Sequence, residues 1–313
     1  MVSDKRATRL EFRIPISPTP GFFAQVRLFN FALRRLGGIY AEARIRVVVG
    51  DKCNLDVVRQ LNSWSDDFPI IWDRLPDALF DVAGMWGTAN WRLNLPADDA
   101  DIIILSDADT VLLRDIDPIL GDFLTDRPVV RGHMAHYPPP VDLPQPAQAG
   151  PDFWCELLMA YGTRYTAPWE RYSMDLDHDL PPSPPYFNLG FVAMNPTALE
   201  GFAHDIHWAE AWLKQHNGSH MRCQLAMTLI ACHRDMDIAC LPAAYNMAND
   251  IHHFRASGLT DGDVRVLHYL REIELHRQTF LLPEAIDTFL SRPMVLSINS
   301  RLQDLVRDYR TSL

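Results

Sequence analysis

Apolar, strand-like runs that alternate with helix-like spacers constrain the fold of this chain more than any other feature of its sequence. The runs in the first third of the chain cover residues 10–16, 43–51, 68–75 and 102–105. The first spacer is expected to be a helix with Thr19 as its N-cap and Pro20 at its first position. A short helix is expected over residues 55–61. Apolar strands separated by helices indicate a mainly parallel sheet with both faces covered.

The second half of the chain continues the α/β pattern. Residues 186–196 have the pattern of a strand that ends at Asn195, the expected N-cap of a long amphipathic helix. Ser219 is expected to cap a further helix, which carries Gln224. Two short strands and a helical tail complete the prediction, at residues 237–242, 264–270 and 283–313.

Proline is concentrated between these two halves. Many of the 23 prolines fall in residues 132–185, in the stretches "HYPPPVDLPQPAQAGP" and "DLPPSPPY". A helical pattern near residues 153–162 and several aromatic side chains interrupt this segment. We expect an ordered lid, because long irregular segments inside a compact domain usually serve a function.

Charge and cysteine usage exclude some classes of partner. The formal net charge is −11, whereas nucleic acids and anionic membranes are held by clustered Lys and Arg. The five cysteines form no CxxC pair, and no apolar run approaches the ~18 residues of a membrane span. With no signal-peptide pattern at the start, we expect a cytoplasmic protein. A membrane contact by the tail stays an alternative, which the mixed charges of the tail disfavour.

Two aspartates directly follow the fourth apolar run, in the stretch "DIIILSDADTVLL". Asp107 and Asp109 flank Ala108, and side chains two residues apart on an extended segment point the same way. One divalent cation can therefore bind both carboxylates, at the sheet edge where α/β proteins bind ligands. A phosphate-attacking nucleophile with its acid partner is a second interpretation, and a solvated surface turn is a third.

Further segments, in order along the chain, resemble a known family. "ILSDADTVLLRDI", "YFNLGFVAMNP", "CQLAMTLI", "LPAAYN" and "RVLHYL" resemble GT-A glycosyltransferases. They are nearest to family 8, the retaining sugar transferases that include glycogenin and lipooligosaccharide galactosyltransferases. In that family the two acids and a late histidine bind Mn²⁺, which holds a UDP-sugar; the matching residues are Asp107, Asp109 and His268. The strand-borne Asn of the family matches Asn188, and its helix-borne Gln, near the reacting sugar carbon, matches Gln224.

This sequence departs from the family pattern at three places. Leu189 follows the Asn where a small residue is usual, and Cys223 precedes the Gln where Asp is common. The Gly and the diphosphate-binding Lys expected after the histidine are replaced by Tyr269, Leu270 and Arg271. Arg271 is therefore a candidate for the phosphate role, and Arg92, in the helix before the acids, is another.

The resemblance implies a division of the chain by function. A GT-A-like catalytic domain covers residues 1–282, with a nucleotide-binding half (10–131), the Pro-rich lid (132–185) and an acceptor half (186–282), and the helical tail follows. Thr19 and Asp51, each after an early strand, are candidates to bind the nucleotide base and ribose together with the Asp107–Ala108–Asp109 motif. An ordinary turn and a helix-start aspartate are the alternatives for these two residues.

These predictions describe a metal-dependent, hexosyltransferase-like enzyme. It uses Mn²⁺ or Mg²⁺ and a nucleotide sugar, UDP-linked by resemblance, and its acceptor is a glycan, a lipid-linked molecule or a small molecule. Retaining transfer is favoured, with Gln224 on the sugar face opposite the leaving group and Asn188 contacting sugar hydroxyls. An inverting reaction needs a carboxylate base, for which the candidates are Asp175, Asp177 and Asp179.

Two other functions fit the acid pair. In a HAD-type phosphatase Asp107 is the nucleophile and Asp109 the general acid, but such domains generally open with this strand and need a later lysine. Here three strands precede it, and the only later lysine is Lys214, on a helix. A nucleotide-sugar-binding protein without transfer activity is the third reading. The pairs His252–His253 and His204/His207 are interpreted as solvated, and Trp86 and Trp91 as packing residues.

Overall fold

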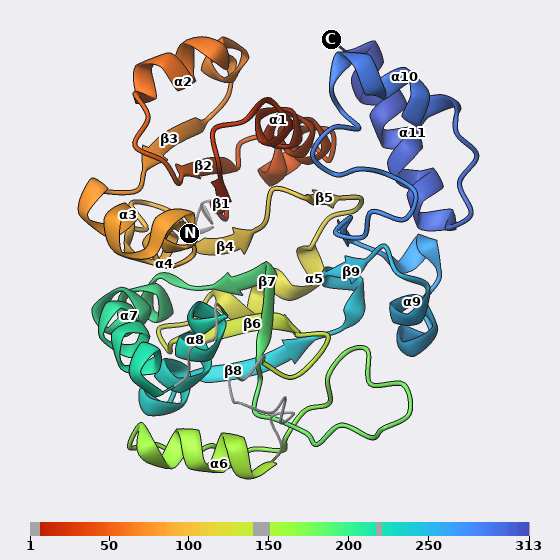
Figure 1. Cartoon of the computed structure of the whole chain (residues 1–313). Helices are drawn as coiled ribbons and strands as arrows, with labels where there is room; N and C mark the ends of the chain where they lie inside the picture. The colour runs from red at the N-terminus through yellow and green to blue at the C-terminus, as the bar shows by residue number, and fades with distance from the viewer. Residues whose placement is uncertain (1–6, 140–150, 217–220, 313) are drawn as a thin grey trace, which may run out of the picture.

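A seven-stranded mixed sheet organises the part of the chain that the computed structural model describes, residues 7–139, 151–216 and 221–312. Its strand order is β3-β2-β1-β4-β7-β6-β8 (Figure 1). Strand β7 runs antiparallel to β4 and β6, and the other neighbours pair in parallel. The strands are β1 (Leu10–Ile16), β2 (Arg44–Val49), β3 (Ile70–Arg74), β4 (Ile102–Ser106), β6 (Val129–Met134), β7 (Phe187–Met194) and β8 (Asp237–Leu241). The predicted α/β fold with a mainly parallel sheet is confirmed.

Helices cover both faces of this sheet, as the sequence pattern predicts. They are α1 (Pro20–Arg34), α2 (Leu55–Leu61), α3 (Asp77–Ala83), α4 (Gly87–Asn94), α5 (Asp117–Leu120), α6 (Pro151–Ala160), α7 (Pro196–His216), α8 (Arg222–His233), α9 (Ile251–Ser257), α10 (Pro283–Ser291) and α11 (Ser297–Thr311). Strand β4 shows why two layers form. Ile103 and Leu105 join the core beneath α7 and α8, whereas Ile102 and Ile104 join the core beneath α1.

Local signals in the sequence located several elements correctly. Thr19 caps α1, and its hydroxyl accepts a hydrogen bond from the N–H of Phe22. Asn195 caps α7 in the same way, accepting from the N–H of Ala198 at 3.1 Å. Ser219, the expected cap of α8, lies outside the described residues.

Strand β6 was not predicted from the sequence, because Arg131 and Gly132 interrupt its apolar pattern. Gly132 is required there, since a Cβ atom would lie 2.7 Å from the ring of Phe187 on the neighbouring strand. The strand also runs across the predicted boundary at residue 132. The functional division of the chain stays a prediction.

The Pro-rich segment is described at residues 132–139 and 151–185, and residues 140–150 lie outside the described part of the chain. Trp154 of α6 is buried and donates a hydrogen bond to the hydroxyl of Tyr172 at 3.1 Å. Glu170 and Ser183 form an isolated antiparallel bridge. The aromatic side chains of this segment pack into the main core, and its role as a lid stays a prediction.

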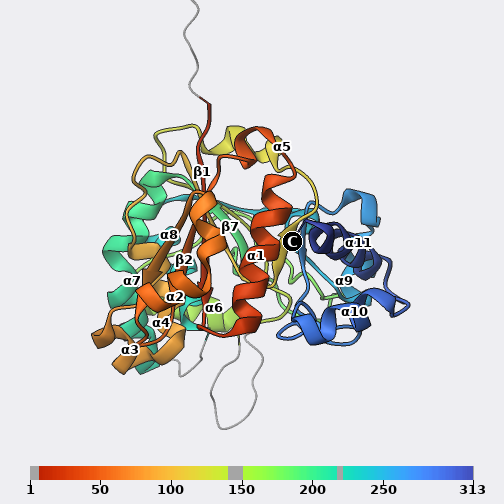
Figure 2. The same cartoon turned by 90° about the horizontal axis from the view of Figure 1, so that it is seen from above.

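The C-terminal helices α10 and α11 pack on a second, three-stranded sheet and on α1. This sheet has the order β5-β10-β9, from β5 (Thr110–Leu112), β9 (Met247–Ala248) and β10 (Val266–His268). Figure 2 shows α10 and α11 beside α9, on the opposite side of α1 from α3 and α4. The apolar face of α11, including Leu302, is buried in this core. Among the described residues, no helix is long and apolar enough to cross a membrane.

Candidate metal centre

The two acids stand in the turn between β4 and β5. The hydroxyl of Thr110 donates to the carbonyl of Asp107 at 2.7 Å and lies 2.7 Å from the hydroxyl of Ser106, which closes the turn. The side chain of Asp107 is 33% exposed and that of Asp109 is 11% exposed. One carboxylate therefore faces solvent while the other lines the interior.

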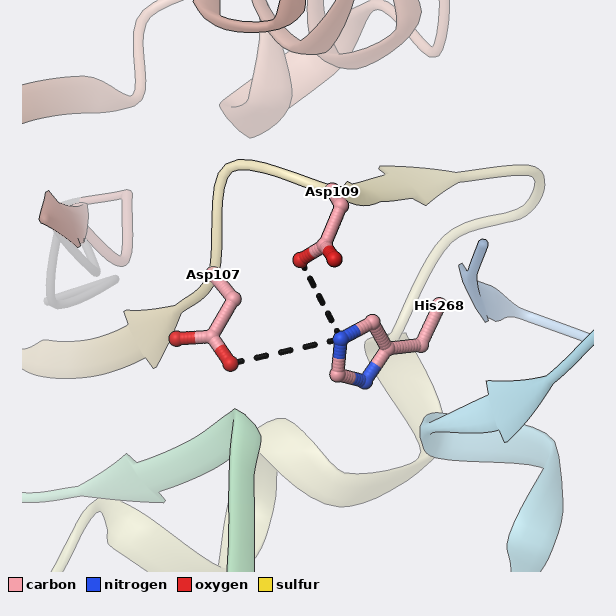
Figure 3. A group of neighbouring side chains, drawn as sticks. All are labelled: Asp107, Asp109 and His268. Carbon is pink, nitrogen blue, oxygen red and sulfur yellow. Dashed lines mark hydrogen bonds and ion pairs between the residues drawn. The ribbon is translucent and has the colours of Figure 1, made fainter. Parts of the chain in front are cut away.

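His268 reaches the acids through strand pairing. Strand β10 pairs antiparallel with β5, and His268 stands opposite Thr110 in that register. Its Nε2 lies 3.2 Å from Oδ1 of Asp109 and 4.0 Å from Oδ2 of Asp107 (Figure 3). One ligand atom from each residue lies within 4.8 Å of the others. The structure thus brings together the three residues predicted to bind a metal, although His268 lies 159 residues after Asp109 in the sequence.

Charge pairing dominates the electrostatics of this group. Burial alone would raise the pKa of Asp109, but His268 and Arg277 outweigh it and lower the pKa to about 2. Burial would likewise lower the pKa of His268, but the charge of Asp109 and its hydrogen bond raise it above the ordinary value. Asp109 is therefore ionised at neutral pH.

The donor set fits a divalent cation. Two carboxylates and one imidazole suit Mn²⁺ or another divalent ion with mixed oxygen and nitrogen preference. If Nε2 of His268 binds the metal, its other ring nitrogen, Nδ1, must carry the proton and needs an acceptor. Among the residues that the structure describes, neither the buried Nδ1 nor the buried Oδ1 of Asn246 has a hydrogen-bond partner. Both atoms face Gly190 of β7, where a Cβ atom would collide with each.

Arg277 is a site residue that the sequence analysis missed. It lies in the segment after β10, and its Nη1 is 2.7 Å from Oδ2 of Asp109. No periodic pattern marks that segment, so only the structure reveals the contact. Arg271, the residue that the sequence analysis proposed for the diphosphate, forms an ion pair with Asp250 at 2.8 Å, and its phosphate role stays a prediction.

Arg92 lies on the other side of the acid pair. Its side chain is 1% exposed, and its Nη1 lies 3.6 Å from Oδ1 of Asp107. It also donates to the carbonyl of Ser106 at 3.3 Å. Arg13 of β1 donates to the carbonyls of Arg92 and Leu95, at 2.5 and 2.8 Å, and so fixes the end of α4 that carries Arg92.

Asn188 and Gln224 lie on two separate elements, β7 and α8. Oδ1 of Asn188 accepts hydrogen bonds from the Gly190 N–H at 2.9 Å and from Nδ2 of Asn246 at 3.0 Å. Gln224 lies in the first turn of α8. Its neighbour Cys223 lies close enough to the site for Arg92 and Asp107 to influence it, although burial is the main cause that raises its pKa to about 12.

The predicted nucleotide-binding residues follow strands that end at the same edge. Thr19 and Asp51 come after β1 and β2, which run parallel to β4. In the structure Thr19 acts as the cap of α1, and Oδ1 of Asp51 accepts the N–H of Lys52. The carbonyl of Ala108 accepts from the hydroxyl of Tyr269 at 3.2 Å. Their contact with a nucleotide stays a prediction.

A buried histidine cluster corrects one expectation. His253 is fully buried, not solvated, and its Nε2 lies 3.1 Å from Nε2 of His133. Nδ1 of His253 accepts from the N–H of Ala248, so its Nε2 carries the proton and donates to His133. His133 must then donate through Nδ1 to the carbonyl of Leu241 at 3.1 Å. The chain of hydrogen bonds thus requires both rings to be neutral.

The other predictions about histidine and tryptophan residues have mixed outcomes. His252 is exposed, and so are His204 and His207, as expected. Trp86, interpreted as a packing residue, is 59% exposed. It lies in a one-turn helix between α3 and α4.

Comparisons with known proteins identify the class of fold. No protein-family model matches the sequence, and no curated protein sequence matches it. The apo structure of the bifunctional glycosyltransferase WbbM superposes with a TM-score of 0.55 at 14% identity, over 96% of this chain and 52% of that one. The fold is GT-A-like.

Two further structures resemble this chain more weakly. Mouse xyloside xylosyltransferase 1, in its apo form, gives a TM-score of 0.48 at 15% identity, over 84% of this chain and 97% of that one. Core-mannan synthase A (CmsA/Ktr4) from Aspergillus fumigatus, in its Mn/GDP form, gives 0.46 at 8% identity, over 77% and 74%. Within the GT-A-like fold, membership of family 8 stays a prediction. This chain spans about half of the WbbM chain.

Proposed function

We propose that this protein is a metal-dependent glycosyltransferase that moves a sugar from a nucleotide diphosphate sugar to an acceptor. One observation carries the proposal. Asp107, Asp109 and His268 converge at the carboxyl end of β4, in a fold that resembles a known glycosyltransferase. Acid pairs after strands are common, but an imidazole placed 159 residues away in sequence against the same pair favours a shared ligand.

The residues around the acids suit cleavage of a sugar–diphosphate bond. A bound divalent cation would supply Lewis-acid stabilisation of the charge on the leaving diphosphate. Arg92 adds a buried positive charge beside Asp107. Thr19 and Asp51, at the ends of β1 and β2, are the proposed contacts to the nucleotide, for which UDP is proposed from the family resemblance alone.

A retaining reaction is the proposed stereochemical course. Of the three lid aspartates considered as an inverting base, Asp175 is 3% exposed, and its Oδ1 accepts the N–H groups of Asp179 and Leu180. A carboxylate that closes a turn in this way is a poor base for an acceptor hydroxyl. Gln224 and Asn188 are the proposed contacts to the transferred sugar. The acceptor is proposed to be a glycan, a lipid-linked molecule or a small molecule.

The direct test is a panel of nucleotide sugars incubated with the protein and Mn²⁺, scored by release of the free sugar and the nucleoside diphosphate. We expect slow hydrolysis of one donor that stops on chelation. The Asp109→Asn variant should lose about 100-fold or more of this activity, because a metal ligand is removed. The exposed Asp126, in the loop before β6, provides the matched control, Asp126→Asn. Turnover that persists in chelator would contradict the proposal.

The same panel separates the other two interpretations. A phosphatase would hydrolyse simple phosphate esters with Mg²⁺ and be inhibited by metallofluorides. The structure gives this reading little support, because the acids meet a histidine, and Lys214 is exposed on α7. A binding protein without activity would be stabilised against heat by a nucleotide, with no turnover.

A further inference from the structure

Both oxygens of Asp109 are engaged by cationic or proton-donating groups of the protein itself. Oδ1 faces Nε2 of His268 at 3.2 Å, and Oδ2 accepts from Nη1 of Arg277 at 2.7 Å. His268 is almost completely buried and can remain as a ligand of a metal ion. The guanidinium of Arg277 cannot, because it has no lone pair to offer and carries a charge of the same sign as the metal.

The main chain at Arg277 is held firmly against α1. Its carbonyl accepts a hydrogen bond at 2.8 Å from Nε2 of Gln25, a fully buried residue. At the next residue, Gln278, the carbonyl carbon lies 3.0 Å from where a Cβ atom on Gly21 would be, and the oxygen lies closer still. Gly21 and Gln25 are one turn apart on α1, so the backbone of this segment is fixed beside the proposed nucleotide loop.

The side chain of Arg277 is much less constrained than its backbone. It is 41% exposed, compared with 11% for the carboxylate that it contacts. No group of the described residues accepts a hydrogen bond from its Nε, and the carboxylate of Glu272, which is itself 44% exposed, lies 3.6 Å from that nitrogen. The guanidinium can therefore leave Asp109 by rotating its side chain, without moving the backbone and with an acidic neighbour within reach.

We propose that Arg277 is a placeholder cation for the metal centre. It neutralises Asp109 until a divalent cation binds to Asp107, Asp109 and His268, and the cation then displaces it. Two charges of the same sign within a few ångströms of Asp109 repel each other strongly in a partly buried site. The displaced guanidinium stays close to the metal, where it can pair with an anionic group that the metal carries. This inference depends on the proposed function only in requiring that a divalent cation binds here.

Arg271 does not compete for this role. Its Nε donates to Oδ2 of Asp250 at 2.8 Å, and its backbone N–H and carbonyl both bond to the side chain of Asn249. Asp250 caps α9 at the same time. The side chain of Arg271 already has an acid partner of its own outside the metal site and approaches the sulfur of Met174 at 3.7 Å, whereas the side chain of Arg277 donates to Asp109 itself.

The test compares Arg277→Met with Arg310→Met. Arg310 of α11 is a matched control, because its side chain is 42% exposed and forms an ion pair at 2.8 Å with Asp287, far along the chain from the acids. Mn²⁺ alone is titrated into each protein and its free concentration followed by electron paramagnetic resonance. Arg277→Met should bind Mn²⁺ about tenfold more tightly than the wild type, because no internal cation has to be displaced. Arg310→Met should match the wild type.

A second titration adds inorganic pyrophosphate at saturating Mn²⁺. Here Arg277→Met should bind about tenfold more weakly than the wild type, since the guanidinium that pairs with the anion is gone. Arg277→Lys, which keeps the charge, should lie closer to the wild type in both titrations. Equal or weaker Mn²⁺ binding by Arg277→Met, or unchanged pyrophosphate binding, would overturn the placeholder role while leaving the metal centre intact. If the wild type binds no Mn²⁺, both the placeholder and the metal-dependent function fall.

Discussion

Replacing Gly190 by alanine tests whether the orientation of His268 matters. A Cβ atom at this position would lie 2.7 Å from Cε1 of His268, closer still to Nδ1, and 2.8 Å from Oδ1 of Asn246. Carbon atoms in contact prefer about 3.5–4.0 Å, so the ring must retreat by about 1 Å. That movement disturbs the 3.2 Å contact between Nε2 and Asp109. Overpacking of this size costs about 1–3 kcal/mol of folding free energy.

Urea denaturation and Mn²⁺ titration measure the two consequences separately. We expect Gly190→Ala to lower the free energy of unfolding by about 1–3 kcal/mol and Mn²⁺ affinity by about 10–100-fold. Gly121→Ala is the control, because a Cβ atom there meets nothing within 4 Å and its φ of −60° suits alanine. The control should be neutral or slightly stabilising. A Gly190→Ala protein with wild-type stability and wild-type metal affinity would refute the steric argument.

Two further predictions concern the histidine cluster and the C-terminal tail. Burial is the main cause that lowers the pKa of His253 to about 3. The unfolded chain therefore takes up its proton first as the pH falls below about 6.5, and this histidine should cost about 2 kcal/mol of stability between pH 6.5 and 5. His253→Gln should lose correspondingly less stability on acidification in urea denaturation, whereas the exposed His252→Gln should behave as the wild type, and equal losses for both variants would exclude this account. Leu302→Ala in α11 should lower the free energy of unfolding by about 2–5 kcal/mol. Val295 is 94% exposed, so Val295→Ala should change it hardly at all. Equal stabilities of the two variants would mean that the tail is not part of the core.

The sequence was sufficient to predict those elements whose formation depends on contacts between residues close together in the chain. The N-cap of α1 by Thr19 and the apolar run of β4 depend on residues within a few positions of one another. Strands β5 and β9 have three and two residues, too few for a period of two to be recognised, whereas β10 lies inside the strand predicted at residues 264–270. The error at His253 has a simple cause, since neighbouring residues of a helix point about 100° apart. One histidine of the pair can therefore be buried while the other is exposed.

The contacts that define the site join residues that are far apart in the sequence, so local sequence patterns do not predict them. Arg277 meets Asp109 across 168 residues of sequence, and Nδ2 of Asn246 meets Asn188 across 58. Gly190 is required because the ring of His268 and the side chain of Asn246 both lie against it. Nothing in the composition of these segments predicts such neighbours. The acids and His268 were proposed together only because the order of the motifs resembles a family.

The register of one short strand pair links the C-terminal tail to the metal centre. In the pairing of β5 with β10, Val111 stands opposite Leu267, and Thr110 stands opposite His268. Val111 and Leu267 are buried in the core that α10 and α11 complete, so the adjacent pair faces the other way, toward the acids. A slip of one residue would bury His268 under the tail and turn Leu267 toward Asp109. The apolar contacts of the tail therefore select the register in which an imidazole, and not an isobutyl group, reaches the two carboxylates.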